Sequence, residues 1–354
     1  MRAARRRIGG EMKFGVFDHM DASGLPLRDF FENRLRLAEA YDRIGIHALH
    51  IAEHHGTPLG LSPAPSVFLS AVAQRTRRLR FGPLVYTLPL YHPLRLVEEI
   101  CILDQLSGGR LELGVGRGVS PFEFGYMGVD LKQSQGMYFE AYQIILKALA
   151  SRTLTFEGEH YRFRESPIVL EPVQKPHPPL WYGVSNPEST EWAAQNGLNA
   201  VSNSPADVVR GVTDRYRAEW ASRGKDPKRM PLVGMTRHVV IAGTDREAVD
   251  SARRAYRRWY ENFALLWRAN EVPLPRTVFY TEDFERMLEG RLVIAGSPQT
   301  VRDALAAQAA QAGVNYLLMR FAFGDLSLEE TLRSVELFAK QVMPALAAVP
   351  APVT

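Results

Sequence analysis

The chain has 354 residues, of which 46% are hydrophobic and 23% are charged, and its formal net charge is +4. These values are typical of a globular protein with one large domain or two medium ones, and no apolar stretch approaches the ~20 residues of a membrane span. Four arginines (Arg2, Arg5, Arg6 and Arg7) against Glu11 give the first 11 residues a net charge of +3, so the rest is nearly neutral. The excess positive charge is confined to this tail and does not form a basic surface, so we expect neither nucleic-acid nor membrane binding.

The start of the chain also bears on location and domain organisation. It lacks the apolar core and cleavage site of a secretory signal. The single cysteine, Cys101, excludes an internal disulfide framework and suits a reducing compartment, so we expect a cytoplasmic protein. Residues 1–12 are predicted to be a basic, disordered extension, and residues 13–349 to form a single domain.

Strand-like and helix-like segments alternate along the first third of the chain. Strands are predicted at 13–17, 47–53, 79–88 and 111–118. Helices are predicted between them at 27–44, 66–75 and 92–106. The strand-like runs are apolar without alternation, which is typical of strands buried on both faces of a parallel sheet.

The alternation resumes after residue 178. Further strands are predicted at 179–185, 198–203, 232–242 and 315–321. Further helices are predicted at 187–196, 205–223 and 328–346. About eight strands over the whole length favour an α/β fold of the (β/α)8 TIM-barrel type. An open dinucleotide-binding sheet is disfavoured because no G-x-G-x-x-G follows the first strand.

Two stretches break this rhythm. Residues 153–163 predict a hairpin that turns at Glu157-Gly158. Residues from about 244 to 295 form an insertion late in the barrel that is rich in arginine and aromatic residues. We expect this insertion to lie at the catalytic rim and to act as a lid.

Two adjacent histidines follow the second strand, in the segment IAEHHG (51–56). Function in a barrel is carried by the carboxyl ends of the strands, which is where His54 and His55 lie. A zinc ion needs three or four ligands, and adjacent strand residues point to opposite faces, so a shared metal is disfavoured. A general base and a histidine that merely packs remain equally good interpretations.

Two other segments could hold a phosphate. In GVGRGVSP (114–121), Arg117 could bind it bidentately, although a solvated arginine in a turn is an equal alternative. In SNPESTEW (185–192), the helix start could bind an anion through its amides and hydroxyls, although ordinary capping explains the same residues. The residues concerned are Ser185, Asn186, Ser189 and Thr190. A phosphate between Arg117 and this helix start would be a coherent pair.

With these segments in place, the chain resembles the luciferase-like flavin monooxygenases, and most of all the catalytic α subunit of bacterial luciferase. The resemblance runs from residue 13 to about residue 346. The matching stretches, in the same order and at nearly constant spacing, are MKFGVF, AEHH, TLPLYHPLRLVEEICILDQLSGGR, GRG-x-x-x-x-EF-x-x-x-G-x-D, STEWAAQNGL, AGSPQTV and LFAKQVMPAL.

The resemblance implies an enzyme that uses reduced FMN (FMNH2) and O2 through a flavin C4a-peroxide. A separate flavin reductase would supply the FMNH2, and the substrate would be a small organic molecule such as an aldehyde or a ketone. Two alternatives keep the fold: an F420-dependent hydride-transfer enzyme, and a non-catalytic flavin-binding paralogue.

The resemblance also assigns individual residues. It makes His54 the histidine that supports catalysis beside the flavin, with His55 structural. It places Arg117 on the FMN phosphate, together with the helix start that contains Ser185, Asn186, Ser189 and Thr190. Leu84 and Val85 match a pair joined by a non-prolyl cis peptide beneath the flavin ring. Glu123 matches an acidic position near the flavin.

The chain departs from the luciferase pattern at three positions. Gly116 stands where luciferase has its reactive cysteine, Gln135 replaces a second phosphate-site arginine, and Ser204 replaces a tryptophan near the ring. These departures predict weaker FMN binding and put light emission in doubt. A homodimer is expected, with the helices around 66–75 and 93–106 at its interface.

Overall fold

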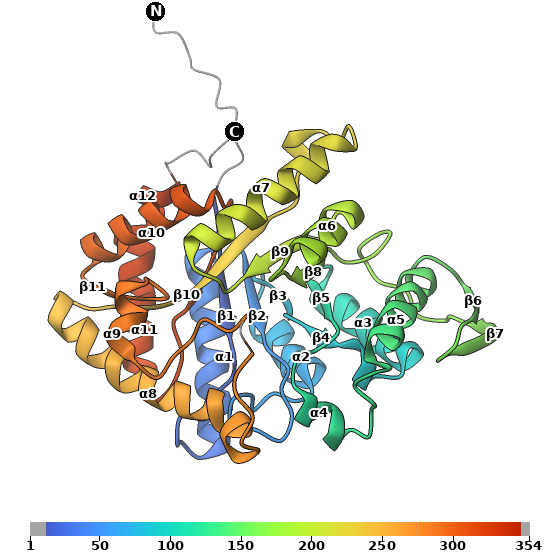
Figure 1. Cartoon of the computed structure of the whole chain (residues 1–354), viewed down its shortest axis with the longest axis horizontal. Helices are drawn as coiled ribbons and strands as arrows, with labels where there is room; N and C mark the ends of the chain where they lie inside the picture. The colour runs from blue at the N-terminus through green and yellow to red at the C-terminus, as the bar shows by residue number, and fades with distance from the viewer. Residues whose placement is uncertain (1–11, 276, 348–354) are drawn as a thin grey trace, which may run out of the picture. The chain divides into compact units, whose positions relative to one another are not determined.

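The computed structural model describes residues 12–275 and 277–347, so the predicted extension lies outside these residues except for Met12. Two compact units are defined by the contacts within the chain. Unit 1 contains the described residues up to Val16, together with Val184–Tyr260 and those from Leu274 onward. Unit 2 contains Phe17–Gly183 and Glu261–Pro273. Strands and helices alternate along both, as the colour ramp of Figure 1 shows.

Unit 1 is built on parallel strands. They are β1 (Lys13–Asp18, whose last two residues belong to unit 2), β9 (Asn199–Ser202), β10 (Val233–Ile241), β11 (Val293–Gly296) and β12 (Tyr316–Arg320). Strand β12 pairs with both β1 and β10, and β10 also pairs with β9 and β11. A Cβ on Gly15 would lie 1.9 Å from the Tyr316 hydroxyl, so only glycine lets this tyrosine fit against β1.

Helices follow these strands in unit 1. They are α6 (Pro187–Asn196), α7 (Ala206–Ser222), α8 (Asp245–Ala269, which ends in unit 2), α9 (Phe284–Glu289), α10 (Pro298–Ala312), α11 (Leu328–Leu337) and α12 (Met343–Ala347). Helix α6 begins at a capping box and ends at Gly197, whose φ of 68° is the left-handed conformation that glycine adopts readily.

Unit 2 has short parallel strands. They are β2 (Ala48–Ile51), β3 (Arg80–Pro83), β4 (Tyr86–Thr87), β5 (Leu113–Gly116) and β8 (Leu180–Gly183). Strand β2 pairs with β3, and β5 pairs with β4 and β8. The residues of β2 and of β5 are all buried, which explains their apolar sequences without alternation. The carboxyl ends of these strands carry the candidate site.

Helices cover the strands of unit 2. These helices are α1 (Leu27–Ile44), α2 (Pro65–Arg75), α3 (Pro93–Ser107), α4 (Pro121–Tyr126) and α5 (Ser134–Leu149). The hairpin consists of β6 (Thr153–Glu157) and β7 (Arg162–Pro167).

The alternating strands and helices predicted from the sequence are confirmed, with local differences. Helices α1 and α6 have the predicted bounds, and the hairpin turns after Glu157 as expected. The sequence analysis made no prediction for α4 and α5. The predicted insertion contains α8 and α9, but its last residues belong to β11, which pairs with β10. The end of the predicted insertion is therefore corrected: residues 293–295 are part of the sheet.

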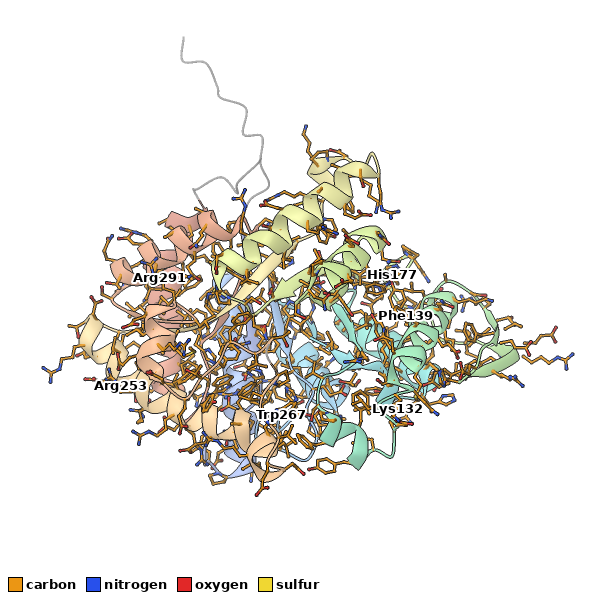
Figure 2. The ribbon with its side chains drawn as sticks, in the orientation of Figure 1. Lys132, Phe139, His177, Arg253, Trp267 and Arg291 are labelled. Atoms are coloured by element: carbon orange, nitrogen blue, oxygen red, sulfur yellow. The ribbon has the colours of Figure 1, made fainter. Side chains whose placement is uncertain are left out.

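Helix α8 dominates the region of the predicted insertion, and Figure 2 labels Trp267 in its last turns, which belong to unit 2. The lid function of this region stays a prediction. Within the described ranges, no helix has both the length and the apolar character needed to cross a membrane.

Candidate active site

His54 follows strand β2 and is held by a carboxylate from helix α4. Its Nδ1 lies 3.0 Å from Oε1 of Glu123, with 20% and 10% of the two side chains exposed. Since the carboxylate accepts, Nδ1 carries the hydrogen, and Nε2, which has a lone pair whenever the ring is neutral, has no partner among the described residues. Glu123 is placed by Ser120, whose hydroxyl accepts a bond from the Glu123 amide at the start of α4. A histidine oriented in this way by a carboxylate has the geometry of a general base.

His55 has a different partner, Glu53. Its Nε2 lies 3.1 Å from Oε1 of the buried Glu53, whose other oxygen accepts a hydrogen bond of 2.6 Å from Tyr91. Burial lowers the pKa of His55, but the hydrogen bond and charge of Glu53 outweigh it, and the net pKa is raised. The two histidines therefore bind different carboxylates, and Glu53 joins both His55 and Tyr91 to the end of β2. The part of the chain that the structure describes contains no group of three or more His, Cys, Asp or Glu that could hold a metal.

The Leu84–Val85 peptide bond, between β3 and β4, is cis, as the sequence analysis predicted. Gly116 at the end of β5 packs directly against Val85. A Cβ on Gly116 would lie 2.4 Å from Cγ2 of Val85, closer than carbon atoms approach. A larger residue at Gly116, such as the cysteine that the resemblance places here in luciferase, would force Val85 to shift. The flavin contact of Leu84 and Val85 stays a prediction.

Arg117 follows Gly116 and is a half-buried cation. Its one hydrogen bond within the described residues is a long one, 3.4 Å, to the carbonyl of Gly118. No carboxylate among the described residues forms an ion pair with Arg117. A half-buried guanidinium without an acidic partner is suited to an anionic ligand such as a phosphate.

The start of helix α6, in unit 1, is closed by its own side chains. The Asn186 side chain accepts from the Ser189 amide at 2.8 Å, and the Ser189 hydroxyl accepts from the amides of Ser185 and Asn186 at 3.3 Å each. Thr190 is buried and its hydroxyl donates to the Asn186 carbonyl. This is the capping alternative considered from sequence. An anion bound here would replace the two 3.3 Å hydrogen bonds that the Ser189 hydroxyl accepts. A phosphate shared between this helix start and Arg117 stays a prediction.

His19 lies beside His54 and was missed by the sequence analysis. It follows β1, and its ring stacks on that of His54 with a centroid distance of 6.0 Å and an interplanar angle of 29°. The side chain is 8% exposed. The signal available in the sequence was its place at the carboxyl end of the first strand, in FDHMD, which is the place that drew attention to the other histidines.

A histidine–carboxylate pair and a half-buried arginine after the carboxyl ends of parallel strands are typical of an α/β enzyme. Comparisons with known proteins agree with this class. The family model for luciferase-like monooxygenases matches residues 12–316. Protein y4wF of Sinorhizobium fredii, which is described as uncharacterized, is 42% identical and aligns over 96% of this chain and 98% of its own length. The oxygenase component of a flavin-dependent trigonelline monooxygenase from Acinetobacter baylyi is 27% identical over 94% of this chain and 95% of its own.

A solved structure extends this likeness to three dimensions. Monooxygenase RslO1 from Streptomyces bottropensis matches with a TM-score of 0.85 and 27% identity, over 94% of this chain and 99% of its own. The chain therefore belongs to the luciferase-like monooxygenase family. It is a flavin-dependent monooxygenase with the TIM-barrel fold predicted from its sequence.

Proposed function

We propose that the chain is the oxygenase component of a two-component system that oxidises a small aldehyde or ketone with reduced FMN and O2. A separate reductase supplies the reduced FMN. The substrate gains one oxygen atom, the other leaves as water, and FMNH2 is oxidised to FMN. The observation that carries this proposal is the bond from His54 to Glu123, which leaves Nε2 of the histidine as a base with a fixed orientation.

The residues present fit FMN. Arg117 is a half-buried cation without an acidic partner among the described residues, as a phosphate requires. The family resemblance assigns the start of α6 to the same phosphate, through the amide and hydroxyl groups of Ser185, Asn186 and Ser189. When bound, reduced FMN supplies the electrons that activate O2.

The protein's own groups have two tasks in this reaction. Nε2 of His54 accepts a proton from the reacting substrate and returns it to the departing oxygen, while Glu123 balances the resulting positive charge. Apolar side chains exclude water from the region beside Glu123: Phe122 of α4 packs edge-on against Trp267, with centroids 5.3 Å apart. Exclusion of water limits the side reaction in which O2 is released as hydrogen peroxide without oxidation of the substrate.

Binding of reduced FMN is the first measurement. We expect the protein to bind FMNH2 under anaerobic conditions and, once oxygen and a suitable aldehyde or ketone are added, to form an oxygenated product. Arg117→Ala should weaken FMNH2 binding by about 10- to 100-fold, because one charge-assisted hydrogen bond is worth about 1.5–3 kcal/mol. The affinity of Arg117→Lys for FMNH2 should lie between that of the wild type and that of Arg117→Ala. Arg95→Ala, which removes a 72% exposed arginine from α3, is the control and should bind as the wild type does.

Titration with deazaflavin F420 completes this test. Tight binding of F420 together with no binding of FMNH2 would contradict the proposal. Binding of FMNH2 with no oxygenated product from any aldehyde or ketone would contradict the substrate class while leaving the cofactor in place.

We also propose that the chain forms a homodimer through α2 and α3. These helices expose apolar side chains: Val67 is 74% exposed, Ile102 48% and Leu106 49%. A monomer is better served by polar residues at such positions. Sedimentation velocity should give twice the chain mass, and Ile102→Glu with Leu106→Glu should give the monomer. Val169→Glu, at a 79% exposed position outside both helices, should leave the dimer intact.

A further inference from the structure

The loop that carries His19 is fastened to the loop that carries His54. Three backbone hydrogen bonds join them: Ala52 N to Asp18 O at 2.9 Å, Leu61 N to Met20 O at 2.8 Å, and Ala22 N to Pro58 O at 2.8 Å. Both loops belong to unit 2. The two histidines are therefore held at a fixed separation by the backbone on either side of them.

The backbone around His19 is itself tightly determined. Met20 adopts a φ of 60°, a left-handed conformation that non-glycine residues avoid. Asp18 stabilises it, since one carboxylate oxygen accepts the Met20 amide at 2.7 Å and the other lies 3.0 Å from Nε of Arg34. Strained backbone that its surroundings hold in place is characteristic of functional sites.

The ring of His19 contacts an apolar and an ionisable neighbour. Phe17 meets it edge-on at 4.9 Å, and it stacks on His54 at 6.0 Å. If the position served packing alone, an apolar side chain would fill it without burying a polar ring. Two imidazoles at this distance repel each other when both are protonated, so each influences the charge of the other.

Carboxylates lie near both histidines, in space or along the chain. His54 faces Glu123 at Nδ1, with the His55–Glu53 pair adjacent in the chain. His19 is flanked by Asp18, which is paired with Arg34, and by the buried Asp21. A general base must be neutral to accept a proton, and a protonated ring stacked on it opposes its protonation.

We propose that His19 is a positioning residue that, when it carries a proton itself, opposes the protonation of His54. This role rests on the proposed function of His54 as a base. Glu123 fixes which nitrogen of His54 carries the hydrogen, and a protonated His19 opposes the addition of a second proton at Nε2.

The test is a histidine titration by NMR on the protein without flavin. His19→Phe keeps a flat ring but cannot be protonated, so the apparent pKa of His54 should rise by about one unit. His19→Gln, which keeps a polar side chain, should give the same rise and covers the case in which the phenylalanine variant folds poorly. An apparent pKa of His54 that both substitutions leave unchanged would overturn the proposal.

Steady-state kinetics give the second readout. In His19→Phe the acidic limb of the kcat/KM profile should move to higher pH by the same amount, so activity should fall at the acidic end of the profile and match the wild type at the alkaline end. A loss that is equal at every pH would show that His19 only supports the fold, and would also overturn the proposal. The NMR titration needs no turnover, so it tests the effect of His19 on His54 even if no oxygenase reaction is detected.

Discussion

Replacing His54 with alanine is expected to lower kcat for substrate oxygenation by about 10²- to 10⁴-fold, the usual contribution of a positioned base. The affinity for reduced FMN should stay within a few-fold of the wild type, because the phosphate is assigned to Arg117 and not to His54. The physical reason lies in Nε2, the ring atom that Glu123 leaves without a partner among the described residues. The measurement is product formation at saturating FMNH2, with FMNH2 binding measured separately.

Glu123→Gln is the matched variant for this prediction. Its amide oxygen can still accept the Nδ1 hydrogen, so the ring keeps its orientation while the balancing charge is lost. We expect a loss smaller than that of His54→Ala, of about 10-fold, which is typical of removing charge support from an oriented base. His92→Ala, at an exposed position on a different loop, should have no effect. Wild-type product formation by the alanine variant would exclude His54 as the base.

Several site residues could be recognised from the sequence because their chemistry is unusual for their place. His54 and Arg117 follow strands directly, at the end of a parallel sheet where function is carried. Their partners could not be recognised in the same way. Glu123 was expected near the flavin, yet in the structure it bonds to His54 from 69 residues away. Pattern and spacing give the position of a residue along the chain, but the choice of partner depends on how distant segments pack.

The partner of His19 could not be predicted from the sequence either. Taken alone, FDHMD is a strand end with one histidine, and nothing in it indicates a stacked neighbour. Its pairing with His54 depends on backbone bonds such as that from Ala52 to Asp18, which form only when two loops meet. The start of α6 could be read either as a cap or as an anion site, and the structure shows the cap, because Asn186 and Ser189 satisfy each other.

The fold was predictable where local signals agree. Helix α1 runs from Leu27 to Ile44, as predicted, and ends at Gly45, whose backbone is left-handed. Strand β11 is four residues long and follows directly on the helical segments of the predicted insertion, so periodicity could not separate it from them. Its pairing with β10 decides its structure. Helix α5 did carry a signal, since buried residues such as Tyr138, Tyr142 and Ile145 recur every three or four positions.

Asp18→Ala is expected to destabilise the fold by about 3–5 kcal/mol, more than any surface substitution in this chain. Asp18 and Arg34 form an ion pair of 3.0 Å in which the side chains are only 5% and 7% exposed. Removing the carboxylate leaves a buried guanidinium without its charge partner, and also removes the acceptor for the Met20 amide. The free energy of unfolding, measured by urea titration, tests this expectation.

Two further variants separate the charge from the packing. In Asp18→Leu with Arg34→Met both charges are replaced by apolar side chains, so the double variant should be more stable than Asp18→Ala, because no buried charge is left unpaired. The i,i+4 pair of the exposed Arg95 and the half-buried Glu99 on α3 is the control, since such pairs on helices contribute only about 0.3–0.5 kcal/mol. If Asp18→Ala were no more destabilising than Arg95→Ala, the buried pair would not hold the end of β1 in place. The fixed position of His19 beside His54 would then need another explanation, because Asp18 is the residue that joins β1 to both Arg34 and Met20.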